Sequence, residues 1–167
     1  MDWSFDESYG PAYEVAQICL NGPVINDCAR TSQVVNQDHC EKCGQPTTTK
    51  CPSCYSNIRG RLLGADVIQG NFAAPSYCWK CGHQYPWTER RLRAAKELAD
   101  EFDELDEADR EKLKKSIDDL VKDSPAMEVA GTRFKKIVGK LGKASGEAIK
   151  RVVIDICSEA AKKVLFQ

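Results

Sequence analysis

The sequence has few of the residues that enzymes use to bind phosphate groups or to activate a nucleophile. It contains two histidines, no glycine-rich loop of the kind that holds phosphates, and no Ser/His/Asp pattern. No apolar run approaches the roughly 18 residues of a membrane-spanning helix, and the opening residues, MDWSFDESYG, lack the apolar core of a signal peptide. We therefore expect a cytoplasmic protein that has no membrane span and is not an enzyme.

Cysteine, in contrast, is abundant and clustered. Eight of the nine cysteines lie in the first 81 positions. From Cys40 to Cys81 the chain reads CEKCGQPTTTKCPSC, then a 23-residue insert, then CWKCGH, which makes three C-x2-C pairs. Two thiolates at this spacing reach one ion from a tight turn, and Gly44 and Gly82 accept the positive φ that such a turn needs. The pattern predicts zinc knuckles.

Each knuckle supplies two thiolates, but a structural zinc ion takes four ligands, so knuckles must pair. We favour a tandem arrangement, in which the second and third knuckles share one zinc ion and the first knuckle joins Cys19, which precedes an Asn-Gly turn. Two alternatives remain. The first two knuckles could form a compact finger, leaving the third to pair with Cys19 and Cys28, or alternating pairs could form a cross-brace. We expect one or two structural zinc ions.

Composition divides the chain in two. Residues 1–87 hold 14 charged residues and residues 88–167 hold 35. We predict an α+β protein with a lead-in over 1–12, a zinc-ribbon domain of short antiparallel strands over 13–87, and a helical bundle over 88–167. Strands are expected on both sides of the Asn21–Gly22 turn and in the glycine-containing run 57–77. The expected helices cover 89–104, a stretch beginning near 106, a stretch whose first residue is Pro125, and 144–165, with Thr88 and Ser124 as caps.

Charge is uneven in the helical half. Residues 88–124 carry nine basic and 13 acidic side chains, and residues 125–167 carry nine basic and four acidic ones. The simplest interpretation is that the acidic helices neighbour the basic ones. The other is a surface for nucleic acid or an acidic partner on helices 125–165. The candidate binding residues, which include two tryptophans of the zinc-ribbon half, are Trp79, Trp87, Arg133, Lys136, Lys140 and Lys143.

The phrases YEVAQICLNG, CEKCG, KCPSC, PSYCWKCG and YPWTE resemble a family of uncharacterised bacterial zinc-ribbon proteins. The similarity extends into the helices through DSPAMEVAGTRFKKI and DICSEAAKK. The resemblance implies a zinc-ribbon module followed by a helical tail. It supplies no biochemical activity.

One position departs from the family pattern. A histidine that commonly follows the Asn-Gly turn would be the second ligand beside Cys19, but Pro23 stands there and cannot bind zinc. The fourth ligand of the first site would then be Cys28, His39 or water, and we favour Cys28. With that choice the predicted metal ligands are Cys19, Cys28, Cys40, Cys43, Cys51, Cys54, Cys78 and Cys81.

Closed thiolate sites without catalytic groups favour a zinc-binding adaptor that presents loops to a protein partner. A nucleic-acid-binding protein is the first alternative, and a ubiquitin-ligase-like or phage-defence accessory module is the second. The amphipathic helical tail is also compatible with a homodimer.

Overall fold

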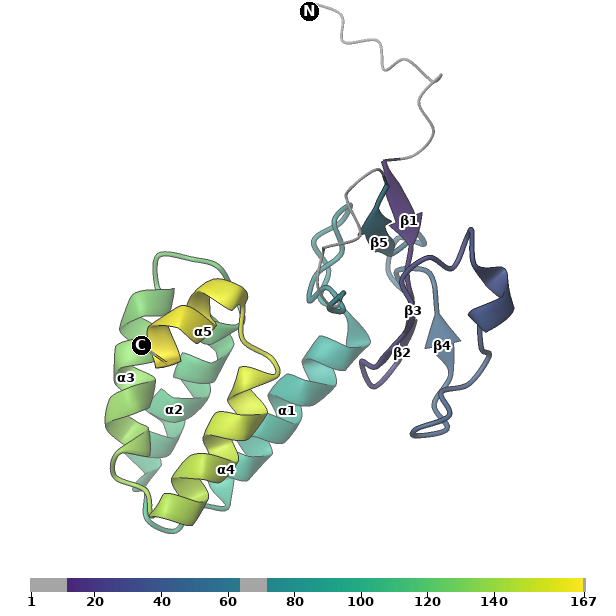
Figure 1. The fold of residues 1–167 in the computed structure, drawn as a ribbon. Helices are drawn as coiled ribbons and strands as arrows, with labels where there is room; N and C mark the ends of the chain where they lie inside the picture. Colours follow the sequence, from purple (N-terminus) through teal and green to yellow (C-terminus); the bar gives the residue numbers. More distant parts are fainter. Residues whose placement is uncertain (1–11, 64–71, 167) are drawn as a thin grey trace, which may run out of the picture. The chain divides into compact units, whose positions relative to one another are not determined.

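The computed structural model describes residues 12–63 and 72–166, so the lead-in expected over 1–12 lies almost wholly outside it, as does the middle of the glycine-containing run. The chain divides into two compact units, Met1–Trp87 and Thr88–Gln167. We call them the cysteine unit and the helical unit. The predicted α+β class is confirmed, with small antiparallel sheets in the first unit and helices in the second (Figure 1).

The cysteine unit contains two small sheets. Strand β1 (Tyr13–Val15) pairs with β5 (Arg59–Leu62), and β2 (Gln17–Cys19) lies between β3 (Val24–Asn26) and β4 (Thr47–Thr48), all antiparallel. A short 3-10 helix (η1) covers Gln33–Val35. The hairpin between β2 and β3 turns at Asn21 and Gly22 as predicted. Gly22 has φ of 104°, which favours glycine.

The core of the cysteine unit is built around two stacked aromatic rings. Tyr85 and Trp87 are both about 1% exposed, and their ring centroids lie 4.5 Å apart. The Trp87 indole N–H donates to the Pro75 carbonyl at 2.8 Å. Ile18 and Ile58 of the sheet region belong to the same buried cluster, together with Ala16 and two of the cysteines, Cys51 and Cys78. A hydrophobic core this small contributes little stability by itself.

Helix α1 (Pro86–Asp100) begins at the end of the cysteine unit and continues into the helical unit, which also contains α2 (Glu107–Leu120), α3 (Met127–Val138), α4 (Lys143–Ile154) and α5 (Glu159–Phe166). Helix α3 packs against both α2 and α5 (Figure 1). The predicted apolar stripes face the interior, where Leu113, Ile117, Phe134, Ile149 and Val153 are buried. Among the described residues, no helix is both long and apolar enough to cross a membrane.

Three predictions about helix ends are wrong. Helix α1 begins at Pro86, so Thr88 lies inside its first turn instead of capping it. Helix α3 begins at Met127, because Ser124 and Pro125 form a turn in which the Ser124 carbonyl accepts from the Met127 N–H at 3.0 Å. The helix expected over 144–165 is broken after Ile154, and the hydroxyl of Ser158 accepts the Ala161 N–H at the start of α5.

Candidate metal centre

The three knuckles share one backbone design. In each, the N–H of the residue after the second cysteine donates to the carbonyl of the first cysteine, at 2.8 to 2.9 Å. That residue has φ of 68° at Gly44, 59° at Tyr55 and 70° at Gly82. The predicted role of the glycines is confirmed, and the middle knuckle achieves the same left-handed turn with a tyrosine.

Each knuckle is the tip of a minimal hairpin. The N–H of its first cysteine donates to the carbonyl five residues later, and the flanking residues form a single bridge. These bonds bury the first cysteine of every knuckle, while the second is half-buried or exposed. The backbone hydrogen bonds of each knuckle therefore hold its two cysteines in a fixed turn.

The second and third knuckles meet in one four-thiol cluster. The sulfurs of Cys51, Cys54, Cys78 and Cys81 all lie within 4.8 Å of one another. Cys51 Sγ is 3.8 Å from Cys81 Sγ, and Cys54 Sγ is 3.7 Å from Cys78 Sγ. A Zn–S bond of about 2.3 Å in a regular tetrahedron separates two sulfurs by about 3.8 Å. The cluster therefore has the dimensions of a tetrahedral thiolate site.

This grouping is the tandem arrangement. The compact finger and the cross-brace both require other pairs of knuckles to meet, and the structure does not bring those pairs together in its described residues. The ubiquitin-ligase-like alternative depended on the cross-brace, so it loses its structural basis.

The surroundings of the four-thiol cluster lower the thiol pKa of Cys54 and Cys78. Against the backbone hydrogen bond at His83, burial and the neighbouring thiols raise the pKa of Cys81 to about 11. The Ser56 hydroxyl lies 3.1 Å from Cys54 Sγ and 3.4 Å from Cys78 Sγ. Burial opposes ionisation of Cys78, but this hydroxyl and the backbone N–H groups of Cys81 and Lys80 lower its pKa to about 5. Burial raises the pKa of Tyr85, whose hydroxyl has no hydrogen-bond partner in the part of the chain that the structure describes.

The first knuckle meets the end of β2 in a second cluster. The sulfurs of Cys19, Cys40 and Cys43 lie within 4.8 Å of one another, and Cys19 Sγ is 3.4 Å from Cys43 Sγ. Burial raises the pKa of Cys19 to about 11, because an apolar environment disfavours the charged thiolate. The cluster brings together three of the four ligands predicted for this site.

Cys28, the predicted fourth ligand, is not part of this cluster. Its backbone N–H donates to the Asn26 side chain at 2.9 Å, and Asn26 also donates to the Ser32 carbonyl. Burial and the neighbouring Asp27 carboxylate raise the pKa of the Cys28 thiol. The loop is therefore organised around Asn26 and Asp27. We predicted that Cys28 would reach the cluster from a flexible loop, and it does not. His39 forms the bridge with Pro46 and is likewise outside both clusters.

The sequence reasoning missed one polar side chain at the second cluster. The Asn21 backbone N–H donates to Cys19 Sγ at 3.4 Å, and its amide nitrogen lies 3.6 Å from Cys43 Sγ. From the sequence, the Asn-Gly pair predicts only a turn, although a turn directly after Cys19 also places the Asn21 side chain beside the cluster.

The two candidate tryptophans have different environments. Trp87 is buried, so the expectation that it belongs to a binding surface is wrong. Trp79 is 52% exposed, and its indole N–H donates to the Asn57 carbonyl. The Arg59 guanidinium stacks between two rings, 4.1 Å from the centroid of Trp79 and 4.6 Å from that of Tyr13. We call Tyr13, Arg59 and Trp79 the aromatic surface.

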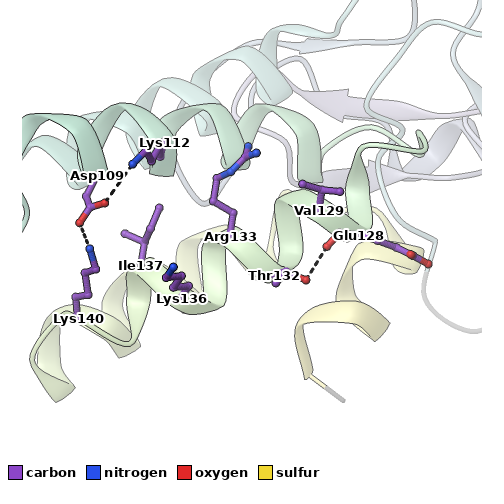
Figure 2. Close-up of a pocket in the computed structure, with 9 residues that line it drawn as sticks. All are labelled: Asp109, Lys112, Glu128, Val129, Thr132, Arg133, Lys136, Ile137 and Lys140. Atoms are coloured by element: carbon purple, nitrogen blue, oxygen red, sulfur yellow. Dashed lines mark hydrogen bonds and ion pairs between the residues drawn. The ribbon is translucent and has the colours of Figure 1, made fainter.

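Three of the four candidate basic residues line one groove of the helical unit (Figure 2). Arg133 and Lys136 of α3, and Lys140 in the turn after it, join Lys112 of α2 around a volume of about 600 Å³, whereas Lys143 is not in the lining. Asp109 pairs with both Lys140 and Lys112. The hydrogen bond from Lys140 holds the pKa of Asp109 below its usual value.

Comparison with known proteins gives a family but no activity. No curated protein and no solved structure matches the chain. One family model, described as an uncharacterized protein conserved in bacteria (DUF2321), matches residues 12–165 and so covers both units. By this match the chain belongs to the DUF2321 family of uncharacterised bacterial proteins.

Proposed function

We propose that the protein is a zinc-binding adaptor without catalytic activity. In this proposal a four-thiolate zinc site holds the cysteine unit in shape, and the aromatic surface beside it contacts a protein partner. The observation that carries the proposal is the pairing of a closed, tetrahedral set of thiols with an exposed, ordered Trp79 on the third knuckle.

The choice of zinc follows from the ligands and their spacing. Four thiolates in a tetrahedron are the donor set of structural zinc sites. The sulfur separations of 3.7 and 3.8 Å suit a Zn–S bond of the usual length. Such a site is closed, with no coordination position for a substrate, so its contribution is folding free energy and not catalysis.

The aromatic surface has the composition of a protein interface. Tryptophan, tyrosine and arginine dominate binding energy at interfaces, because they bury large areas with few rotatable bonds. Here the stacking of Arg59 and the indole hydrogen bond of Trp79 fix these side chains before binding. Pre-organised side chains lose little entropy when a partner arrives, which favours affinity.

Affinity capture with chemical crosslinking tests the adaptor role. The wild-type chain, Trp79→Ala and the control Val34→Ala, which removes an apolar side chain that is 93% exposed, are used as baits in bacterial lysate. We expect a partner that the wild type and the control retain and that Trp79→Ala loses by about 30-fold, the effect of a hot-spot residue worth 2 kcal/mol. Equal capture by all three baits, or turnover of a substrate by the purified chain, would contradict the proposal.

One observation favours nucleic-acid binding as a second candidate. In the described part of the chain, Arg133 and Lys136 form no ion pair, although both line the groove on α2 and α3. Two uncompensated cations on a concave surface can contact two phosphates of a single strand. The groove also carries Asp109 and Glu128, which lowers its net charge, so we place this candidate second.

Binding of fluorescent single-stranded DNA at low and moderate salt tests this candidate. The double variant Arg133→Glu with Lys136→Glu should lose binding, and the control pair Lys122→Glu with Lys163→Glu, which changes the net charge equally, should keep it. The logarithm of the affinity should fall with the logarithm of salt concentration. Equal loss in both double variants would show that only net charge matters and would remove the groove from consideration.

A further inference from the structure

The second cluster has three thiols where a tetrahedral ion takes four ligands. Cys19, Cys40 and Cys43 come from the end of β2 and from the first knuckle. In the four-thiol cluster each half contributes two sulfurs, but the β2 half of this cluster contributes only Cys19. In the part of the chain that the structure describes, the turn after Cys19 places a further polar side chain, that of Asn21, beside the cluster.

Asn21 lies in that turn and touches the cluster with two groups. Its backbone N–H is bonded to Cys19 Sγ, and its side-chain amide is 3.6 Å from Cys43 Sγ. A ligand oxygen about 2.0 Å from an ion and a sulfur about 2.3 Å from the same ion lie about 3.5 Å apart at the tetrahedral angle. The amide end of Asn21 is thus at the separation from Cys43 that a fourth ligand would have.

The amide can present oxygen instead of nitrogen at this position. Rotation by 180° about the last side-chain bond exchanges the two atoms and leaves the rest of the residue in place. The nitrogen donates to a thiolate while no ion is bound, and the oxygen has the lone pairs that a cation requires. Pro23 offers no side-chain donor, and Cys28 is held elsewhere by Asn26 and Asp27.

We propose that Cys19, Cys40 and Cys43 bind a second divalent metal ion whose fourth ligand is the amide oxygen of Asn21. This inference rests on the proposed zinc-binding function and deepens it. Binding of the ion displaces three thiol protons to solvent and leaves a complex of charge −1, against −2 for the four-thiolate site. The neutral amide is the weakest of the four donors, and both Asn21 and Cys43 are exposed. An external thiolate or imidazole can therefore replace it, which makes this site the exchangeable one of the two.

Metal competition on the full chain tests the role of the oxygen. Zinc is titrated against a chromophoric chelator for wild type, Asn21→Ala, Asn21→Asp and the control Asn57→Ala, an exposed asparagine between the knuckles. We expect two ions per chain in wild type and control, with the weaker affinity reduced at least tenfold in Asn21→Ala. Asn21→Asp keeps an oxygen donor and adds a charge, so it should bind the second ion at least as tightly as wild type.

The aspartate variant separates a ligand from a hydrogen-bond donor. If Asn21 served only to donate its amide N–H to a thiolate, aspartate would repel that thiolate, and its affinity would fall as in Asn21→Ala. That result would overturn the proposal, as would one ion per wild-type chain or an unchanged affinity in Asn21→Ala.

Cobalt substitution tests independently whether the side chain of residue 21 coordinates the second ion. Asn21→Cys should add one thiolate to the seven of the two clusters and raise the thiolate-to-cobalt charge-transfer absorbance of the second ion. An unchanged spectrum with two ions bound would place the residue 21 side chain away from the ion and overturn the proposal. The ion of the four-thiol cluster is the internal reference throughout, because its absence from wild type would refute the proposed zinc function instead.

Discussion

The left-handed residue of the middle knuckle offers a test of knuckle energetics that leaves every ligand unchanged. Tyr55 has φ of 59°, where Gly44 and Gly82 have 68° and 70°. The Tyr55 side chain is 74% exposed, so its replacement by glycine removes little packing. The opposite change, Gly82→Ala, adds a Cβ that would have no atom within 4 Å. Both substitutions therefore report the backbone cost of the turn and little else.

The two effects should be opposite in sign. A non-glycine residue in the left-handed region costs roughly 1–2 kcal/mol, and glycine loses about 0.5–1 kcal/mol more conformational entropy on folding. Tyr55→Gly should then stabilise the zinc-bound unit by about 0.5–1 kcal/mol, and Gly82→Ala should destabilise it by a similar amount. Because folding and metal binding are coupled, about 1 kcal/mol appears as a roughly fivefold change in zinc affinity.

Competition with a chelator of known affinity measures this change, with Gly44→Ala as a second control on the first knuckle. The expected order of zinc affinity at the four-thiol site is Tyr55→Gly, then wild type, then Gly82→Ala, with Gly44→Ala equal to wild type there. A loss of affinity in Tyr55→Gly would mean that the Tyr55 side chain, and not the backbone, stabilises the knuckle, and would refute this reasoning.

Four further outcomes follow from the contacts. Verified zinc removal should abolish the near-ultraviolet dichroism of the cysteine unit and leave the far-ultraviolet signal of the helical unit, and a retained aromatic signal would contradict this. Ile117→Ala should cost about 2–5 kcal/mol in denaturant unfolding, since Ile117 is 0% exposed; under 1 kcal/mol would mean that the core collapses around the gap. Gly131→Ala should cost about 1–3 kcal/mol, because the added Cβ would lie 2.6 Å from Val164 Cγ1, and Val164→Ala should rescue it; failure of the rescue would place the cost elsewhere. The hydrogen bond from Lys140 lowers the pKa of Asp109, so its stabilisation is present above the unfolded pKa of about 3.8 and lost as the pH falls through the folded value. Lys140→Met should therefore begin acid unfolding at a higher pH, and an unchanged midpoint would show that the pair contributes nothing.

Local patterns in the sequence were enough to predict much of the fold. The Asn-Gly hairpin, the knuckle turns and the apolar stripes of the helices all depend on residues close together in the chain. Helix ends were less predictable, because tertiary contacts compete with local signals. The break after Ile154 is an example, since the Ser158 N–H donates to the Leu120 carbonyl of α2, a bond that no local pattern of 144–165 indicates.

The same difference between local signals and tertiary contacts applies to the candidate metal ligands. Spacing grouped the three knuckles, and the pairing of the second with the third followed from the need for four thiolates. The fourth ligand of the second cluster could not be found this way. Cys28 was chosen for chemistry and nearness in sequence, but the hydrogen bonds of Asn26 and the pairing of Asp27 with Arg61 at 2.6 Å hold its loop elsewhere.

Under the proposals above, one knuckle design supports two kinds of metal site. Each knuckle supplies two thiols in a fixed geometry. The segment that faces it therefore determines whether the site has four thiolate ligands. The second knuckle meets the third, so four thiols come together. The first knuckle meets the β2–β3 hairpin, which contributes one cysteine, Cys19. Asn21 in the turn of that hairpin takes the fourth ligand position in the proposal. Under the proposals made here, the first arrangement gives a permanent structural ion and the second a weaker, exchangeable one. The asymmetry then depends on a single position in the β2–β3 turn, where Asn21 stands.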